Sequence, residues 1–378
     1  MQILCVVSFS TCYIAYMKNK SIVIGDYTLI PTRGQSHKDW LEARSHCIGG
    51  SDVGVLYNLN EWYSSTQLFY EKLGRTDPKD LSENASVHYG SAFEDVVLRD
   101  SQFCDPNGKE NNHIKNFNDG KKLASHVPFP YMVSHNSFPY LLANVDGLGF
   151  KDKSITEQDV IDMVEKEGRM PNPDYIVEIK TQDSYVKDKF QGGLNPSYEM
   201  QVKAYCTIFL DQNPEIYGML YTFCYDKTLT AHNVQIDQSD IEGILTVSKK
   251  FHNLLGQGKE IIDEGYKSNL NEDEIDQNLS QIHPEPKTSV ISHGKFLSDK
   301  FLAKEFVKNN QTIKGNDEDI ELGLRYHKVN AEIKTLTKEK TTISNQFKSK
   351  LVKERCKVID CSPRGRVSYG KRLTNTIK

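Results

Sequence analysis

The chain has 378 residues, of which 38% are hydrophobic and 26% are charged, which excludes a disordered or fibrous protein and allows two domains or one domain with appendages. The net charge of −4 is unevenly spread, because residues 348–378 hold ten Lys or Arg against two acids. Such a basic tail either contacts a polyanion such as nucleic acid or is simply solvated.

The eight cysteines form no metal-binding or disulfide pattern. There is no CxxC pair, and near the C-terminus only Cys356 and Cys361 lie together. This spacing argues against zinc fingers, a four-cysteine iron–sulfur cluster and a disulfide-stapled secreted domain. We therefore expect free thiols in a reducing cytosol.

Residues 1–17 are apolar, but they lack a basic n-region and are interrupted by polar residues such as Gln2 and Ser8. The run is too short to span a bilayer, so it predicts a strand, or a start codon assigned too far upstream, rather than a signal peptide. No other stretch has the character of a membrane span. We treat residues 1–35 as an N-terminal extension of a cytoplasmic protein.

Residues 36–258 predict an α/β domain. It opens with a helix, a tight turn and a helix over 36–74, in which Gly49-Gly50 ends the first helix and Ser51 with Asp52 suits the next N-cap. Helices and strands then alternate, which indicates an α/β rather than an all-α fold. The expected elements are a helix over 90–99, strands within 138–150, a charged insertion over 151–174 with one helix over 156–167, a strand over 175–181, a helix over 197–210, strands over 217–225 and 228–236, and a helix over 239–255.

The C-terminal third changes character. Residues 259–287 hold eight acids against three lysines, so we expect an acidic linker or irregular segment over 259–317. Residues 320–351 repeat apolar side chains at a four–three spacing, with Lys340 as the polar interruption. This period indicates a coiled-coil or helix-hairpin seam, or else an amphipathic helix packed on the main domain. Within the last segment, 318–378, a basic hairpin is expected after the helix.

The chemistry of interest lies around an E-x-K sequence. Side chains at i and i+2 share one face of a strand, so Glu178 and Lys180 point together into one cleft if residues 175–181 form a strand. A carboxylate there suits a hard cation, and an ammonium beside it suits a phosphate and an attacking water. Taken alone the pattern is weak, because E-x-K also begins at Glu285 and Glu332 and an exposed strand face explains it equally well.

Context favours Glu178. Glu285 lies between two prolines and Glu332 lies in the long predicted helix, whereas Glu178 follows the Asp146-Gly147 pair along a run of strand-like segments. The flanking sequence offers a carboxylate on the preceding helix, an amide on the following helix, and a cation near a Gly-Gly turn that suits a phosphate. These residues are Glu94, Gln201 and Arg44 with Ser51.

Six motifs in this order resemble the YqaJ-like viral recombinase family, which contains phage lambda exonuclease and belongs to the PD-(D/E)XK nuclease superfamily. They are Trp40-Leu-Glu-Ala-Arg44, Ile48-Gly-Gly-Ser51-Asp, Gly90-x-x-x-Glu94, Asn144-Val-Asp146-Gly, Glu178-Ile-Lys180 and Tyr198-x-x-Gln201. The resemblance covers residues 36–255. It implies a restriction-endonuclease-like core, with a central mixed β-sheet flanked by helices, extended by the C-terminal long helix and basic hairpin.

The resemblance also implies roles for these residues. Asp146 and Glu178 would be the principal metal ligands, with the Ile179 carbonyl, and Glu94 would bind a second metal or its water. Lys180 would position and activate the nucleophilic water, and Gln201 would orient Lys180 or that water. The 5′-phosphate would be held by Arg44, Ser51 and Asn144.

The implied enzyme is a Mg²⁺-dependent exodeoxyribonuclease that resects double-stranded DNA ends from 5′ to 3′, with Mn²⁺ able to substitute and two ions per site. The family further implies a homotrimer and a single-strand annealing protein as partner. Alternatives are an endonuclease of the restriction or repair type and a non-catalytic DNA-binding scaffold. Two departures are visible: Val145 replaces the usual proline, and Val186 stands where some relatives carry a basic residue, with Lys187 and Lys189 as the nearby basic alternatives.

Overall fold

The computed structural model divides into two compact units, Met1–Val307 and Lys308–Lys378, and each is considered by itself. The residues that it describes are 21–77, 84–104, 113–182, 194–225, 228–284, 296–297, 300, 316–353, 358–360, 366–369 and 373–376. The strand predicted within residues 1–17 lies outside this range. None of the helices in the described residues is long and apolar enough to cross a membrane.

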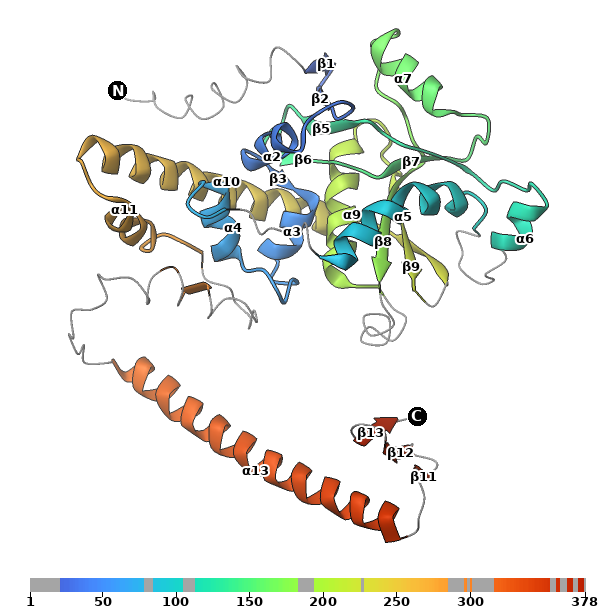
Figure 1. The fold of residues 1–378 in the computed structure, drawn as a ribbon. Coiled ribbons are helices and arrows are strands. Elements are labelled where there is room, and N and C mark those ends of the chain that lie inside the picture. Colours follow the sequence, from blue (N-terminus) through green and yellow to red (C-terminus); the bar gives the residue numbers. More distant parts are fainter. Residues whose placement is uncertain are drawn as a thin grey trace. The chain divides into compact units, whose positions relative to one another are not determined.

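The first unit is an α/β fold, as predicted (Figure 1). Its strands are β1 (Ile22–Ile24), β2 (Tyr27–Pro31), β3 (Ile48–Gly49), β4 (Ser125–Val127), β5 (Tyr131–His135), β6 (Leu141–Leu142), β7 (Gly147–Phe150), β8 (Tyr175–Gln182), β9 (Tyr217–Cys224) and β10 (Leu229–Val234). Its helices are α2 (His37–Ser45), α3 (Gly50–Leu56), α4 (Ser65–Lys72), α5 (Ala85–Ser101), α6 (His113–Asn118), α7 (Glu157–Glu165), α9 (Pro196–Phe209), α10 (Gln238–Lys267) and α11 (Glu272–Leu279).

A mixed five-stranded sheet forms the centre, in the order β10-β9-β8-β7-β4. β8 and β9 are parallel and the other neighbours are antiparallel. Parallel neighbours need a crossover connection, and α9, which lies between β8 and β9 in the chain, supplies it. The predicted central mixed sheet flanked by helices is confirmed.

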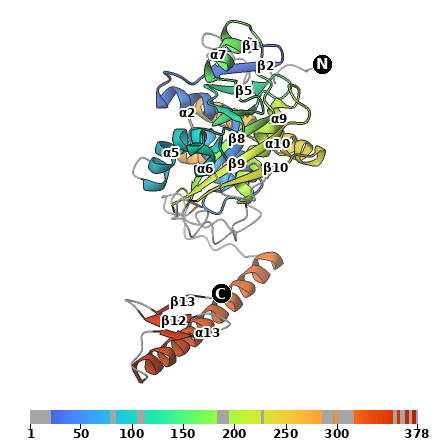
Figure 2. The same ribbon diagram turned by 90° about the vertical axis from the view of Figure 1, so that its right-hand side faces the viewer.

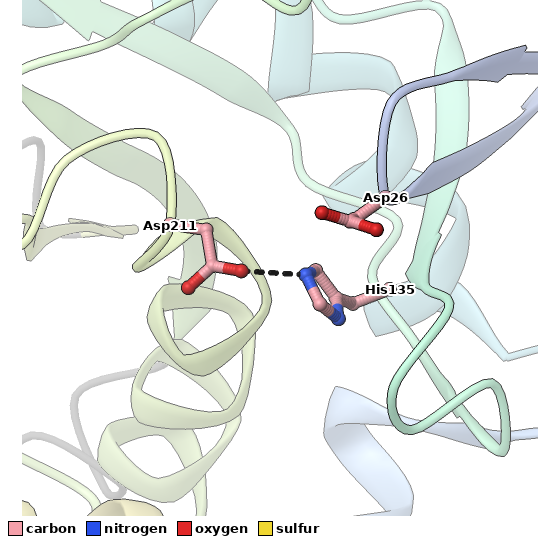
Figure 3. Close-up of side chains that lie close together, drawn as sticks. All are labelled: Asp26, His135 and Asp211. Atoms are coloured by element: carbon pink, nitrogen blue, oxygen red, sulfur yellow. Dashed lines mark hydrogen bonds and ion pairs between the residues drawn. The ribbon is translucent and has the colours of Figure 1, made fainter.

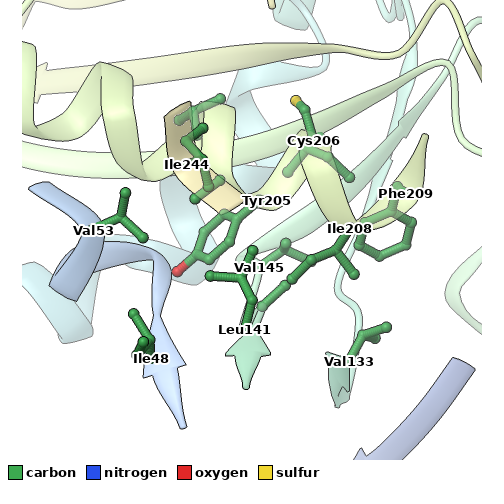
Figure 4. Close-up of a cluster of buried hydrophobic side chains, with 14 of the residues drawn as sticks. Ile48, Val53, Val133, Leu141, Val145, Tyr205, Cys206, Ile208, Phe209 and Ile244 are labelled. Carbon is green, nitrogen blue, oxygen red and sulfur yellow. The ribbon is translucent and has the colours of Figure 1, made fainter. Parts of the chain in front are cut away.

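Side chains of β8 alternate between two apolar layers. Val177 and Ile179 pack with Leu98 of α5 on one face of the sheet. Ile176 belongs to the larger cluster on the other face, where α9 contributes Tyr205, with Cys206, Ile208 and Phe209 beside it (Figure 4). Because the strand period is two, Glu178 and Lys180 belong to the α9 face.

Residues 21–35 are part of the core rather than an extension. β1 and β2 form a hairpin through Gly25, whose φ of +55° suits glycine. β2 then pairs with β5 in antiparallel register from Tyr27↔His135 to Pro31↔Tyr131. Leu29 is fully buried. The sequence interpretation missed this hairpin because its strands are short.

Residues 259–287 are not a linker over most of their length. The helix predicted to end near residue 255 continues to Lys267, because its glycines allow close packing: a Cβ at Gly265 would lie 2.6 Å from Ile275. α11 follows, and it buries Ile275 and Leu279 completely. Its acidic charge is partly neutralised, since the buried Asp276 accepts hydrogen bonds from Arg75 and Lys300 at 2.8 Å each.

The second unit contains the predicted long helix, α13 (Asp317–Lys353). Three antiparallel strands follow in the order β11-β12-β13, where a two-stranded hairpin was expected (Figure 2). Their bounds are Val358–Asp360, Arg366–Tyr369 and Leu373–Thr376.

Candidate active site

The E-x-K strand and the Asp-Gly turn meet as the sequence predicted. β7 pairs with β8 in a register that sets Gly147 opposite Val177, so Asp146 lies next to the start of the E-x-K sequence. An Asp146 carboxylate oxygen accepts a 2.7 Å hydrogen bond from the Ile179 backbone amide. This bond fixes the carboxylate against β8, although the two residues are 33 positions apart.

Glu178 lies at the centre of the site and is only 1% exposed. One carboxylate oxygen, Oε1, accepts hydrogen bonds from the Lys180 ammonium and, at 2.6 Å, from the Gln201 side-chain amide. The other oxygen, Oε2, is buried and has no hydrogen-bond partner among the described residues. The structure thus brings Lys180 and Gln201 together on the same carboxylate, as the motif order indicated, and leaves one oxygen available.

Glu94 approaches from the other side. It lies on α5, which packs against β8, and it is within hydrogen-bonding reach of Asp146. Asn84 caps this helix by accepting from the Ser86 and Val87 amides. The helix therefore starts at Ala85, five residues earlier than predicted, and the extra turn belongs to the same element that carries Glu94.

The carboxyl groups of Glu94, Asp146 and Glu178 repel one another electrostatically. Burial, followed by repulsion from Asp146, raises the pKa of Glu94 to about 7 and that of Glu178 to about 8. Burial also raises the pKa of Asp146, against the attraction of Lys180. Burial lowers the pKa of Lys180, but Glu178 and Asp146 outweigh this effect and hold it above its usual value. The site has more negative charge than Lys180 alone can neutralise.

This donor set fits a hard divalent cation. Magnesium prefers carboxylate oxygens, and the buried Oε2 of Glu178 is an oxygen that a cation would satisfy. Asp146 is within hydrogen-bonding reach of both glutamates and is the shared member of two carboxyl pairs.

A second acidic cluster has a different explanation. Asp26, His135 and Asp211 have potential ligand atoms within 4.8 Å of one another (Figure 3). However, His135 Nδ1 accepts from the Ser137 amide at 3.2 Å, so the ring proton lies on Nε2, which contacts Asp211 at 2.8 Å. The lone pair that a metal needs is therefore in use, and the cluster is a hydrogen-bonded link between β5 and the end of α9.

Arg44 and Ser51 also meet as predicted. The Arg44 guanidinium donates to the Ser51 hydroxyl at 3.1 Å and stacks over Trp40 at 4.5 Å. Burial raises the pKa of the Asp52 carboxyl, but Lys72 and then Arg44 hold it below its usual value, so part of the Arg44 charge is balanced by Asp52. The close approach depends on Gly49, where a Cβ would lie 2.8 Å from the guanidinium.

The predicted N-cap was wrong by two residues. Gly49 is the N-cap of α3, and Asp52 accepts from the Gly49 amide at 2.9 Å. Asp52 also forms a 2.9 Å ion pair with Lys72 of α4, and both side chains are largely buried. Lys72 further donates to the Arg44 and Cys47 carbonyls at 2.8 Å each. This ion pair holds the Arg44 turn, and the sequence analysis missed it because nothing local links the two residues.

Tyr205 is the other residue that sequence reasoning missed. Its hydroxyl accepts from the Gln201 amide at 3.0 Å, and its buried ring lies against Gly50, where a Cβ would overlap it. The same residue therefore touches the support of Glu178 and the turn that carries Ser51. Its position four residues after Gln201, on the same helical face, was the available signal.

Two other expectations are tested less directly. Asn144 is half-buried ahead of β7, and within the described residues no hydrogen bond joins it to Arg44 or Ser51. The structure shows the Ile179 amide bound to Asp146, whereas the ligand role of the Ile179 carbonyl stays a prediction. Val186, Lys187 and Lys189 lie outside the described residues.

Comparison with known proteins finds a related domain. Residues 39–208 match the model of the YqaJ-like viral recombinase domain, so the resemblance predicted from six motifs is confirmed. The chain is similar to the uncharacterized protein YqaJ of Bacillus subtilis (strain 168), with 26% identity over 181 residues. That alignment covers 47% of this chain and 48% of the relative, about half the length of each.

Solved structures give a weaker likeness. One is LHK-Exo in complex with dAMP, and another is the alkaline exonuclease LHK-Exo from Laribacter hongkongensis. Each is 14% identical and covers 61% of this chain and 98% of the other, with TM-scores of 0.42 and 0.40 respectively.

Proposed function

We propose that this protein is a metal-dependent exodeoxyribonuclease that degrades one strand of a double-stranded DNA end from 5′ to 3′. The observation that carries the proposal is the arrangement around Glu178: a buried carboxylate shared by Lys180 and Gln201, with an oxygen left free and Asp146 beside it. The match to the YqaJ-like viral recombinase domain supports the same chemistry.

Asp146 and Glu178, with the Ile179 carbonyl, would hold one Mg²⁺, and Glu94 with Asp146 would hold a second, with Mn²⁺ able to substitute. The ions would supply charge neutralisation of the phosphate and of the oxygen that leaves. Burial, followed by repulsion from Asp146, raises the pKa values of Glu94 and Glu178, and a bound cation would offset both effects.

The chain's own side chains would do the remaining work. The Lys180 ammonium would lie beside the scissile phosphate and hold the attacking water by donating hydrogen bonds, and Gln201 would keep Glu178 and Lys180 in place. Tyr198, whose ring is 5.5 Å from the Lys180 ammonium, borders the same space. Loss of either Lys180 or Gln201 would disturb the position of the attacking water but would leave the metal-binding carboxylates present.

Arg44 and Ser51 would hold the 5′-terminal phosphate, because the Arg44 guanidinium forms no salt bridge in the described residues and the Ser51 hydroxyl lies beside it. A pocket for a terminal phosphate selects an end over an internal site, so it sets the starting point of degradation. Asn144 is the third member proposed for this pocket. The homotrimer and the single-strand annealing partner remain proposals from family resemblance.

A linear duplex with one 5′ end phosphorylated and the other not tests the assignment. We expect Mg²⁺-dependent release of nucleotides mainly from the phosphorylated end, with little attack on a closed circle. Arg44→Ala should remove the preference between ends, whereas Arg99→Ala, a change at an exposed arginine of α5, should preserve it.

The alternatives predict other results. Nicking of the circle at a rate similar to attack on the linear duplex would indicate an endonuclease. Absence of cleavage with Mg²⁺ and with Mn²⁺, combined with retained DNA binding, would indicate a non-catalytic scaffold. Cleavage that persists in excess chelator would contradict the metal-dependent mechanism.

A further inference from the structure

Apolar side chains that repeat at a four–three spacing form a stripe along α13, called the seam below, which the second unit does not cover. Six of its side chains are between 43% and 66% exposed, and Phe347 is half-buried. The seam, defined here by its four–three spacing, comprises Leu322, Tyr326, Val329, Ile333, Leu336, Lys340, Ile343 and Phe347. A 37-residue helix that exposes such a stripe in water needs a partner of matching length.

A second copy of α13 provides that length, and the polar positions on the seam decide its direction. Continuing the spacing by one step at each end adds Asp319 and Lys350, so three charges lie on the stripe with Lys340. In a parallel pair, equivalent positions face each other, and each of these residues would meet its own like charge. That pairing sets three like-charge contacts in the apolar interface.

An antiparallel pair removes these conflicts. When the two seams overlap completely, Leu322 faces Phe347 of the second copy, and Ile333 faces Leu336. The same alignment brings Asp319 opposite Lys350 at both ends. Each seam position then has an apolar or oppositely charged counterpart, except Val329, which faces Lys340.

Lys340 is accommodated by the residues beside the seam. It faces Val329 of the second copy, and the adjacent flanking residue there is Glu332. On the same flank Glu332 lies nearly level with Glu339 of the second copy, and Arg325 lies nearly level with Gln346. The opposite flank carries only small or neutral residues in the same span (Gly323, Asn330, Thr337 and Ser344). The Glu332–Glu339 contacts are like-charged, but they lie at the exposed rim of the pair, where such contacts are weak, and Lys340 is adjacent to each of them.

We infer that α13 pairs with α13 of a second copy of this chain in an antiparallel coiled coil centred between Lys334 and Thr335. The coiled coil joins two chains through a helix that lies outside the proposed active site, so it does not depend on the nuclease assignment. This contact between two chains is independent of any contact that the first unit makes with other copies of the chain.

Cysteine cross-linking of the full-length chain tests both partner and direction. Two proteins are prepared, one with Leu322→Cys and one with Phe347→Cys, carrying tags of different size. The background replaces the cysteines outside the buried set, Cys5, Cys12, Cys356 and Cys361, by serine. After mixing and mild oxidation, we expect the mixed disulfide dimer and little self-linked dimer of either protein.

The other outcomes overturn the inference. Self-linking of each protein alone would show a parallel pair. Absence of any cross-link, together with a monomer mass by light scattering at micromolar concentration, would show that the seam is covered within one chain. Either result is independent of DNA cleavage, which is measured separately on the same samples.

Charge exchange gives a second readout. Asp319→Lys should raise the dimer dissociation constant about tenfold, since it converts two attractive contacts into repulsive ones. Adding Lys350→Asp should restore the original value. Lys338→Asp, an exposed change off the seam, is the matched control and should leave the dimer intact. Failure of the double variant to recover would contradict the antiparallel register, and circular dichroism confirms that each variant keeps its helix.

Discussion

Replacing Glu94 by glutamine should stabilise the protein when no metal is bound, although it removes a proposed metal ligand. Burial and Asp146 raise the pKa of Glu94 from 4.5 to about 7 in the folded state. Ionised Glu94 therefore destabilises the fold, and the loss grows as pH rises from about 4.5 to 7. Glutamine carries no charge at any pH, so its advantage is absent below about pH 4.5 and complete above pH 7.

The size of the effect follows from the pKa difference. At about 1.4 kcal/mol per pKa unit, the shift of Glu94 corresponds to roughly 3 kcal/mol, and partial solvent exposure reduces it to about 2 kcal/mol. For a chain of this length we expect a rise in Tm of roughly 2–3 °C. At pH 5 the gain should be less than half of that at pH 8.

The assay is thermal or denaturant unfolding in excess chelator at both pH values. Glu215→Gln is the matched control, because Glu215 is exposed and far from the carboxylate cluster in sequence and element. Mg²⁺ should reverse the order at pH 8, stabilising the wild type more than Glu94→Gln. A variant that is less stable than the wild type at pH 8 in chelator, or one that gains equally at pH 5, would refute the electrostatic reasoning.

Three further predictions concern the same site. Asp146→Asn should abolish the Mg²⁺-induced stabilisation, which for the wild type should reach about 2.7 kcal/mol at a hundredfold excess over Kd when unfolding is followed by fluorescence. Gly50→Ala should lower the free energy of unfolding by about 1–3 kcal/mol in urea titrations, because its Cβ would overlap the Tyr205 ring; an unchanged value would contradict this packing. Tyr205→Phe should reduce kcat roughly tenfold with little change in KM, since it removes the hydrogen bond from Gln201, and an effect confined to KM would count against a positioning role.

The sequence predicted those parts of the fold whose signals are local. The strand at Tyr175–Gln182 and the helix at Pro196–Phe209 lie within two residues of their predicted bounds, because period and flanking residues agree. The end of α10 was misjudged because Gly258 and Gly265 resemble helix breakers. Their real role is close helix packing, which depends on Phe69, Leu73 and Ile275 elsewhere in the chain.

The candidate site likewise combines contacts that the sequence predicts with contacts that it does not. Glu178 and Lys180 share a strand face, so their contact follows from their spacing alone. Gln201 and Asp146 were predicted from the order of the motifs along the chain. The supports of the site are non-local: the Lys72 ammonium reaches Asp52 and the Arg44 carbonyl from a different helix. No pattern within one segment predicts such a contact.

The central claim is that Asp146, Glu178 and Lys180 form one metal-dependent centre for phosphodiester hydrolysis. The most direct measurement is nucleotide release from a linear, 5′-phosphorylated duplex by the wild type and by Lys180→Ala, with DNA binding followed in parallel by fluorescence anisotropy. We predict Mg²⁺-dependent release by the wild type, loss of release in the variant, and DNA binding by both. Equal release by both proteins would contradict the account.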